Sequence, residues 1–187
     1  MLDALLPQLH GFELLEHSER RPEHAYVRVP KAQLFSLLGL LKQQHGFITL
    51  ATITCTDWLE DEVFRLTYML EDTTRARCLG VQTQIERDGE GMESSIALWP
   101  QAEIFERELH EMFGIPFAGH PRLGDFMLEG WTDIPPMRRE FDTLKFVQET
   151  FEMRSGREDN QDVREAIRKR KEAKKASIAK QKDGGTA

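Results

Sequence analysis

The chain has 187 residues, of which 40% are hydrophobic and 30% are charged, a composition typical of one folded domain with a polar appendage. No apolar run approaches the roughly 20 residues that a membrane span needs. The N-terminus also lacks the basic start and small-residue cleavage site of a signal peptide, so we expect a cytoplasmic location. The two cysteines, Cys55 and Cys78, form no C-x-x-C pair and cannot ligate a four-cysteine iron–sulfur cluster. We therefore expect this chain to hold no metal or redox cofactor.

Charge is distributed unevenly along the chain. Residues 154–187 contain eleven Lys and Arg against six Asp and Glu, a net charge of +5, whereas residues 1–153 contain 14 against 26, a net charge of −12. An acidic body thus carries a basic tail. The helix-prone part of the tail, 162–182, has too few apolar residues for a broad core stripe. We expect it to bind an acidic surface on a neighbouring subunit or on its own body.

Hydrophobic periodicity predicts an α+β fold, in which helices flank a mixed or antiparallel sheet. Leucines at helical spacing and glycines after the helix ends mark the helices, and β-branched or alternating runs mark the strands. The turn Asp72-Thr73-Thr74 connects the last two strands. The predicted helices span 1–10, 31–45, 93–98 and 101–113, and the predicted strands span 25–29, 47–55, 63–70 and 77–85.

Regular periodicity ends after the helix at 101–113. Gly114 stands where a helix C-terminal cap belongs, and Pro and Gly punctuate residues 115–141. This pattern predicts an irregular, extended segment. We divide the chain into an α+β body at 1–114, an irregular partner-docking arm at 115–153 and a basic, partly helical C-terminal extension at 154–187.

The most informative segment is 106–121, Glu-Arg-Glu-Leu-His-Glu-Met-Phe-Gly-Ile-Pro-Phe-Ala-Gly-His-Pro. Its residues alone leave three interpretations open: a surface helix ending in a core anchor, a partner-docking element, or an acid/base cluster of Glu106, Glu108, His110 and Glu111. Side chains one or two positions apart on a helix point apart. Helix geometry therefore argues against a convergence of all four groups.

This segment resembles the signature of the 30 kDa-type subunit of respiratory NADH dehydrogenase, complex I, a family with relatives in membrane-bound, energy-converting [NiFe] hydrogenases. The resemblance rests on Glu-Arg-Glu at 106–108, Met-Phe-Gly-Ile at 112–115, Phe117 and Gly-His-Pro at 119–121. Residues 136–141, Pro-Met-Arg-Arg-Glu-Phe, also resemble the family's Pro-Leu-Arg-Lys-Asp-Phe box. Residues 122–126 lack the usual Arg pair, so the sequence also fits the subunits of this family that occur in hydrogenases.

The resemblance implies a non-catalytic subunit that holds no cofactor and docks on a hydrogenase-like large subunit, beside an iron–sulfur subunit that carries the clusters. It places the chain in the module that links the iron–sulfur chain to the membrane arm, peripherally on the cytoplasmic face. Electron donor and acceptor stay open. The residues expected at the partner interface are Glu106, Arg107, Glu108, Phe113, Gly114, Phe117, His120, Pro121, Trp131, Arg138 and Arg139.

Two other classes of function are disfavoured. A nucleic-acid-binding protein would contact phosphates through the basic residues of 164–182, but the body is acidic and no aromatic residue follows Phe151 to stack on bases. An independent hydrolase is also disfavoured, because the sequence contains neither a G-x-S-x-G elbow nor an H-E-x-x-H metal site.

Overall fold

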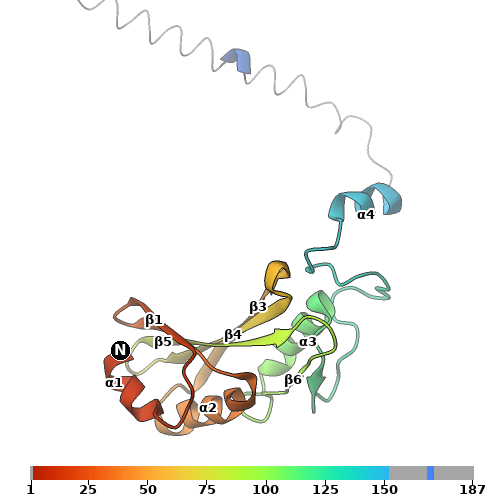
Figure 1. Cartoon of the computed structure of the whole chain (residues 1–187). Helices are drawn as coiled ribbons and strands as arrows, with labels where there is room; N and C mark the ends of the chain where they lie inside the picture. Colours follow the sequence, from red (N-terminus) through yellow and green to blue (C-terminus); the bar gives the residue numbers. More distant parts are fainter. Residues whose placement is uncertain (1, 152–167, 171–187) are drawn as a thin grey trace, which may run out of the picture. The chain divides into compact units, whose positions relative to one another are not determined.

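The computed structural model describes residues 2–151 and 168–170 of the chain (Figure 1). The chain divides into two compact units, Met1–Phe141 and Asp142–Ala187. The first unit is of the α+β class, which confirms the predicted fold class. Its elements, in chain order, are α1 (Leu2–Leu5), η1 (Leu6–Leu9), β1 (Glu16–Arg21), β2 (His24–Arg28), α2 (Lys31–Gln44), β3 (Thr49–Trp58), η2 (Leu59–Asp61), β4 (Val63–Asp72), β5 (Arg77–Glu86), β6 (Met92–Glu93), α3 (Ala102–Phe113) and β7 (Phe117–Ala118).

The first unit is built on one mixed, five-stranded sheet with the strand order β1-β2-β5-β4-β3. Strands β3, β4 and β5 form an antiparallel meander, and β1 pairs antiparallel with β2. The parallel pair is β2 with β5, which α2 makes possible because a parallel neighbour requires a crossover connection. The predicted strands all occur in this sheet.

The helices pack on one face of the sheet. Every second residue of β4, from Phe64 through Leu66 and Tyr68 to Leu70, is buried in one core with the inward leucines of α2 and α1. Phe113 of α3 meets Phe64 edge-on, with ring centroids 5.7 Å apart, so α3 packs on this same face. The opposite face carries no helix of the described part of this unit (Figure 1). That asymmetry follows from the alternating burial of the strands.

Two elements of this unit differ from the sequence-based prediction. The sequence does not predict strand β1, since Glu-His-Ser-Glu-Arg-Arg is exposed throughout and carries no apolar alternation. The short helix predicted at 93–98 is wrong. Met92–Glu93 instead pairs in parallel with Phe117–Ala118, and a turn follows in which Leu98 and Trp99 both donate to the carbonyl of Ser95. The backbone of Met92–Glu93 forms strand hydrogen bonds with Phe117–Ala118, which follows α3, so a helix cannot begin at Glu93.

The second unit contains a helix inside the stretch predicted to be irregular, α4 (Thr143–Thr150). Asp142 caps it by accepting hydrogen bonds of 3.0 Å from the N–H groups of Leu144 and Lys145. Residues 168–170 are helical, and the other residues of the predicted basic tail lie outside the described residues. No helix in the described ranges is long and apolar enough to span a membrane.

The hairpin between β4 and β5 is closed by a buried carboxylate. Asp72 accepts from the N–H groups of Thr74 and Arg75 at 3.1 and 3.2 Å and from the Thr74 hydroxyl, and it pairs with Arg77 at 2.6 Å. Arg77 also donates to the carbonyl of His45 at the end of α2. The hydrogen bonds from Thr74 and Arg77 lower the pKa of Asp72 to about 2. One carboxylate thus ties the predicted turn to the helix below the sheet.

Asp72→Asn should destabilise the chain at neutral pH but not in strong acid. The folded pKa lies below the value of roughly 3.9 expected for the unfolded chain, so the ionised Asp72 contributes stability above that value, and this is lost as pH falls towards 2. At pH 6 we expect the free energy of unfolding of Asp72→Asn, measured by urea unfolding, to be about 1–3 kcal/mol lower than that of the wild-type chain. The deficit should narrow between about pH 5 and pH 2. Glu71→Gln on the same strand is the control, and a gap independent of pH would contradict the assignment.

Candidate partner-docking site

Helix α3 ends at a residue that must be glycine. Gly114 adopts φ +78° and its N–H donates to the His110 carbonyl at 2.8 Å. A Cβ atom there would lie 3.2 Å from Pro135 and 3.3 Å from an Nη atom of Arg138. Both the left-handed backbone and the close approach of residues 135–138 therefore require the absence of a side chain.

Glu106, on the inner face of α3, is fully buried. One carboxylate oxygen accepts from the N–H and the hydroxyl of Ser95, each at 2.7 Å, and the other accepts from the hydroxyl of Ser94 at 2.6 Å. These hydrogen bonds fix the segment that follows β6 against the helix. Glu106 is therefore an internal anchor.

Glu111 holds the next part of the chain. Its Oε1 atom accepts from the backbone N–H groups of Phe126, Met127 and Leu128 at 2.7, 3.2 and 3.1 Å, and Met127 also lies 2.9 Å from Oε2. Burial alone would raise the pKa of Glu111, but these three donors and the nearby Arg107 outweigh it and lower the pKa. One carboxylate thus satisfies backbone groups that have no strand partner.

Two further side chains of the signature fold residues 119–126 back on α3. Arg107 donates to the carbonyl of Asp125 at 2.8 Å, and its guanidinium lies 4.8 Å from the ring centroid of Phe126. The His120 Nδ1 atom accepts from the Arg122 N–H at 3.0 Å, so its Nε2–H can donate to the Glu103 carbonyl, 3.1 Å away. Both polar side chains are thereby used inside the chain.

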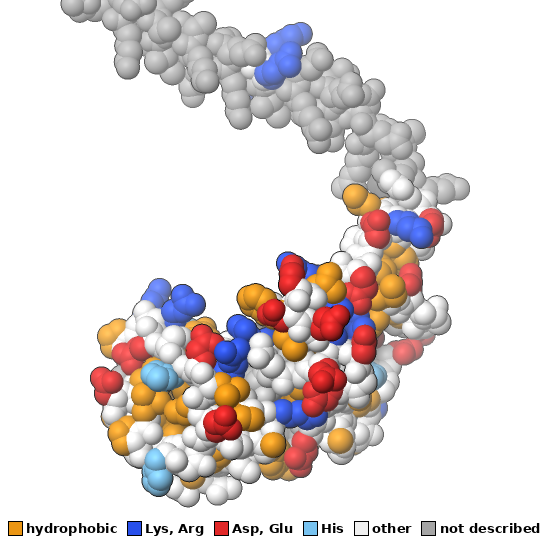
Figure 2. Space-filling model, in the orientation of Figure 1, with side chains coloured by type: hydrophobic (Ala, Val, Ile, Leu, Met, Phe, Trp, Pro, Cys, Tyr) orange, Lys and Arg blue, Asp and Glu red, His pale blue; other side chains and the backbone are white. Residues whose placement is uncertain are grey.

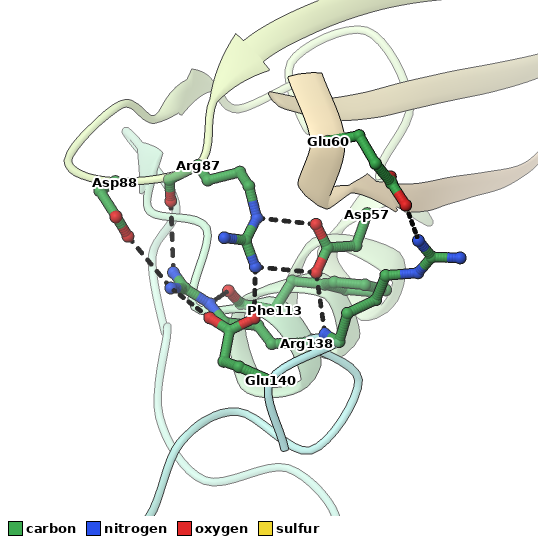
Figure 3. A network of polar contacts seen from close by, with 8 residues as sticks. Asp57, Glu60, Arg87, Asp88, Phe113, Arg138 and Glu140 are labelled. Carbon is green, nitrogen blue, oxygen red and sulfur yellow. Dashed lines mark hydrogen bonds and ion pairs between the residues drawn. The ribbon is translucent and has the colours of Figure 1, made fainter. Parts of the chain in front are cut away.

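A buried ion pair lies where strands β3 and β5 end. Arg87 binds Asp57 with both ends of its guanidinium, Nε to Oδ1 at 2.7 Å and Nη2 to Oδ2 at 3.0 Å, and it also pairs with Glu140. The side chains of Arg87 and Asp57 are only 10% and 3% exposed. Burial alone would raise the pKa of Asp57, but the hydrogen bonds from Arg87 and from the Arg139 N–H outweigh it and lower the pKa. We call Asp57, Arg87, Arg138 and Glu140 the hub (Figure 3).

Arg138 brings residues 135–141 into the hub. Its Nε donates to the carbonyl of Phe113 at 2.8 Å, Nη2 donates to the Arg87 carbonyl at 3.3 Å, and Nη1 pairs with Asp88 at 3.1 Å. The guanidinium groups of Arg87 and Arg138 lie 5.5 and 5.3 Å from the ring centroid of Phe64. The hub therefore joins the end of the sheet, the end of α3 and the Pro-Met-Arg-Arg-Glu-Phe box, as Figure 3 shows.

The family model for the 30 Kd subunit of respiratory-chain NADH dehydrogenase matches residues 27–147, a range that contains the hub and the whole of α3. The chain belongs to this family. An NADH-quinone oxidoreductase subunit of Moorella thermoacetica is 34% identical over 113 residues, which cover 60% of this chain and 76% of that protein. The corresponding subunit of Agrobacterium fabrum is 31% identical over 122 residues, which cover 64% of this chain and 60% of that protein.

Solved structures share the fold. A chain of the membrane-bound sulfane sulfur reductase, an archaeal respiratory membrane complex, matches with a TM-score of 0.72 and 25% identity over 82% of this chain and 93% of that one. A trypsin-resistant fragment of Nqo5 matches with a TM-score of 0.55 and 24% identity over 65% of this chain and 98% of that one. The second likeness shows the fold alone. The predicted family is confirmed.

Most of the predicted interface residues are engaged within the chain. Glu106, Arg107, Phe113, Gly114, His120 and Arg138 make the contacts described above, and Phe117 is buried in β7. Arg139 donates its N–H to Asp57 at 2.9 Å and its guanidinium to Glu60, and Trp131 packs against Phe141 with ring centroids 5.5 Å apart. The remaining two predicted interface residues are Glu108 and Pro121, of which Pro121 is exposed. Which of these residues contact a partner stays a prediction.

Residues 115–141 belong to the first compact unit, although their sequence pattern separates them from the body as part of the arm. Their large exposed apolar side chains include Met127 at 58%, Met137 at 57% and Ile134 at 43%. On the visible face of the body, Figure 2 shows apolar side chains interspersed with acidic and basic ones. We call the exposed side chains of Met127, Ile134 and Met137 the arm surface. It is the candidate site for docking.

Sequence reasoning missed the charged residues of the body that hold the arm, since it considered Glu111 as an acid/base candidate and did not single out Asp57 or Arg87. Asp57, Arg87 and Glu111 hold the arm in position, yet Asp57 and Arg87 are 30 residues apart in the chain and lie outside any motif.

Burial raises the pKa of the Cys55 thiol to about 12. Within the described ranges, no group of three or more His, Cys, Asp or Glu side chains could hold a metal ion.

Asp57→Ala should strongly destabilise the chain, because it removes the two-atom carboxylate partner of the buried Arg87 and leaves it only the more exposed Glu140. Breaking one partner of a buried, hydrogen-bonded pair costs about 3–5 kcal/mol. The matched control is Glu60→Ala, which removes an exposed ion pair with Arg139 and should cost under about 1 kcal/mol. Urea unfolding of the full chain measures both. Equal losses would contradict the structural role of Asp57.

Glu111→Gln should loosen the segment at 126–128 without unfolding the body. The amide replaces an ionised acceptor of three backbone N–H groups, and hydrogen bonds to a charged group are each worth roughly 1.5–3 kcal/mol. Limited proteolysis should therefore cut near 126–128 several-fold faster than in the wild type. Glu108→Gln, a change on the same helix, should leave the cutting rate unchanged. A wild-type rate for Glu111→Gln would show that the carboxylate does not hold this segment.

Proposed function

We propose that this chain is a non-catalytic, hydrophilic subunit of a complex-I-like, membrane-associated oxidoreductase. The observation that carries the proposal is the family match across 27–147, which takes in both the signature helix and the hub. Relatives in the family are named as subunits of NADH-quinone oxidoreductase. A structural neighbour belongs to an archaeal respiratory membrane complex.

The subunit would dock on a hydrogenase-like large subunit, in the module that links the iron–sulfur chain to the membrane arm. The arm surface supports this role, because Met127, Ile134 and Met137 expose apolar side chains on a backbone that Glu111 and Arg138 hold in place. Exposed methionines are frequent at protein interfaces. A surface held before binding loses less conformational entropy on docking.

The chemistry would lie in the partners. We propose that this chain holds no cofactor and that an iron–sulfur subunit of the same complex carries the clusters. The chain would reach the membrane only through the complex, on its cytoplasmic face. NADH dehydrogenase and energy-converting hydrogenase are both compatible with the family, and the archaeal neighbour, a sulfane sulfur reductase, adds a third type of complex. The nucleic-acid alternative finds no support in the family match.

The test is purification of an affinity-tagged chain, expressed at its native level, from its own host after mild detergent extraction. We expect stoichiometric recovery of a large subunit and an iron–sulfur subunit, with iron and oxidoreductase activity in the assembly and neither in the isolated chain. Nickel-ligating cysteines in the large subunit would identify a hydrogenase. Recovery of the chain alone, or with nucleic acid, would refute the proposal.

A further inference from the structure

The sheet has a face that no helix of the described residues covers. On this side the strands present Arg28 from β2, Gln84 from β5, Arg65 and Thr67 from β4, and Thr56 and Trp58 from β3. The inward residues of the same strands are buried in the core beneath α1, α2 and α3. We call the outward side the open face.

The composition of the open face differs from that of a sheet face that only meets water. None of the five strands contains a lysine. Aromatic rings, a methionine, arginines and neutral amide or hydroxyl groups take the central outward positions, and Glu16, Glu71 and Glu86 stand at strand ends. Trp58 is 38% exposed, and Tyr26 lies against Gly80. Protein interfaces are enriched in aromatic residues, Met and Arg, and they are depleted in Lys.

Arg65 stands out on this face because its charge is not neutralised. Its guanidinium lies 4.6 Å from the ring centroid of Trp58, and its cross-strand neighbours are the uncharged Thr56 and Gln84. Within the described residues it forms no ion pair. Its buried Nε has no hydrogen-bond acceptor. Nε itself is shielded from solvent, whereas the terminal nitrogens of this half-buried side chain are not among the buried atoms. An acceptor from another chain would therefore meet the Nη atoms.

A second arginine shows the same deficit. Arg28 pairs with Glu16 through Nη2 at 2.8 Å, yet its Nε is also buried without an acceptor in the described part of the chain. Glu71 and Glu86 stand at the two ends of β4 and β5, opposite Cys78 and Val63, and would repel acidic groups there. Attraction for a carboxylate is therefore confined to the middle of the open face, around Arg65.

We propose that the open face is a docking surface for an acidic segment of another subunit, with a carboxylate of that segment bound by Arg65. This inference rests on the proposed function, since it requires an assembly. A carboxylate can accept from the two Nη atoms of Arg65 together, a bidentate geometry that the Arg guanidinium offers and the Lys ammonium does not. A second copy of the chain fits less well, because a two-fold axis through this face would bring like-charged arginines together.

The first test maps what covers the open face. A photo-cross-linking residue replaces Thr54, which lies on β3 beside Thr56, and in a control chain it replaces Gln43, which is exposed on α2. The tagged complex is purified before irradiation, and the linked peptide is sequenced by mass spectrometry. We expect Thr54 to link to another subunit within a few residues of an Asp or Glu, and Gln43 to give no such product. A link to lipid or to a second copy, or no link in an intact complex, overturns the proposal.

The second test removes the charge. Arg65→Glu should lower recovery of the partner subunits with the tagged chain at least tenfold, and Arg65→Lys should lower it less, because Lys keeps the charge but not the paired geometry. Arg20→Glu, an exposed change on β1, is the matched control and should retain full recovery. A carboxylate-to-Arg change at the cross-linked partner position should restore binding to Arg65→Glu. Normal recovery with Arg65→Glu overturns the proposal.

Folding failure is separated from docking failure by Thr56→Tyr, which places a bulky but strand-compatible ring beside Arg65 and leaves its charge intact. This variant should keep the wild-type melting temperature and still lose partner recovery. If the wild-type chain recovers no partner at all, the proposed function itself fails. If it recovers partners and all open-face variants recover them equally, only the present inference fails.

Discussion

The structure depends on one buried ion pair at the end of the sheet. Asp57 and Arg87 lie at the ends of non-adjacent strands, β3 and β5, and each is almost entirely shielded from water. A buried charge is tolerated only when its hydrogen-bonding capacity is used. Asp57 meets that condition by accepting from two atoms of Arg87 and from the Arg139 N–H. The hydrogen bond from the Arg139 N–H attaches the segment after residue 134 to the end of the sheet.

This pair explains how a segment without regular structure keeps a defined path. Residues 119–141 have no strand ladder of their own, so side chains of the body satisfy their backbone groups or bind them. Glu111 holds 126–128, Asp57 holds the N–H of Arg139, and Arg138 reaches back to Phe113. The apolar side chains of the arm surface then stay outward. The residues of the family signature therefore act largely on their own chain.

Elements that depend on local pattern can be predicted from the sequence. Helix α3, the cap at Gly114 and the irregular course of 115–141 all follow from periodicity and from Pro and Gly. Strand β1 cannot, because an exposed edge strand needs no apolar alternation and is held by its pairing with β2. The hub is also missed, because Asp57 and Arg87 are 30 residues apart and Arg87 and Glu140 are 53 residues apart, and only the folded sheet brings them together. The family box covers Arg138, Arg139 and Glu140, but Asp57 and Arg87 carry no local signal.

The central claim is that carboxylates and arginines of the body fix the arm segment before any partner binds. Hydrogen–deuterium exchange on the isolated full chain measures this directly. The amides of Phe126, Leu128 and Arg139, which donate to buried or half-buried carboxylates, should exchange at least tenfold more slowly than exposed arm amides without such acceptors. Arg138→Met should raise exchange across 134–141 and leave α2 unchanged. Unprotected exchange at all three amides in the wild-type chain would contradict the account.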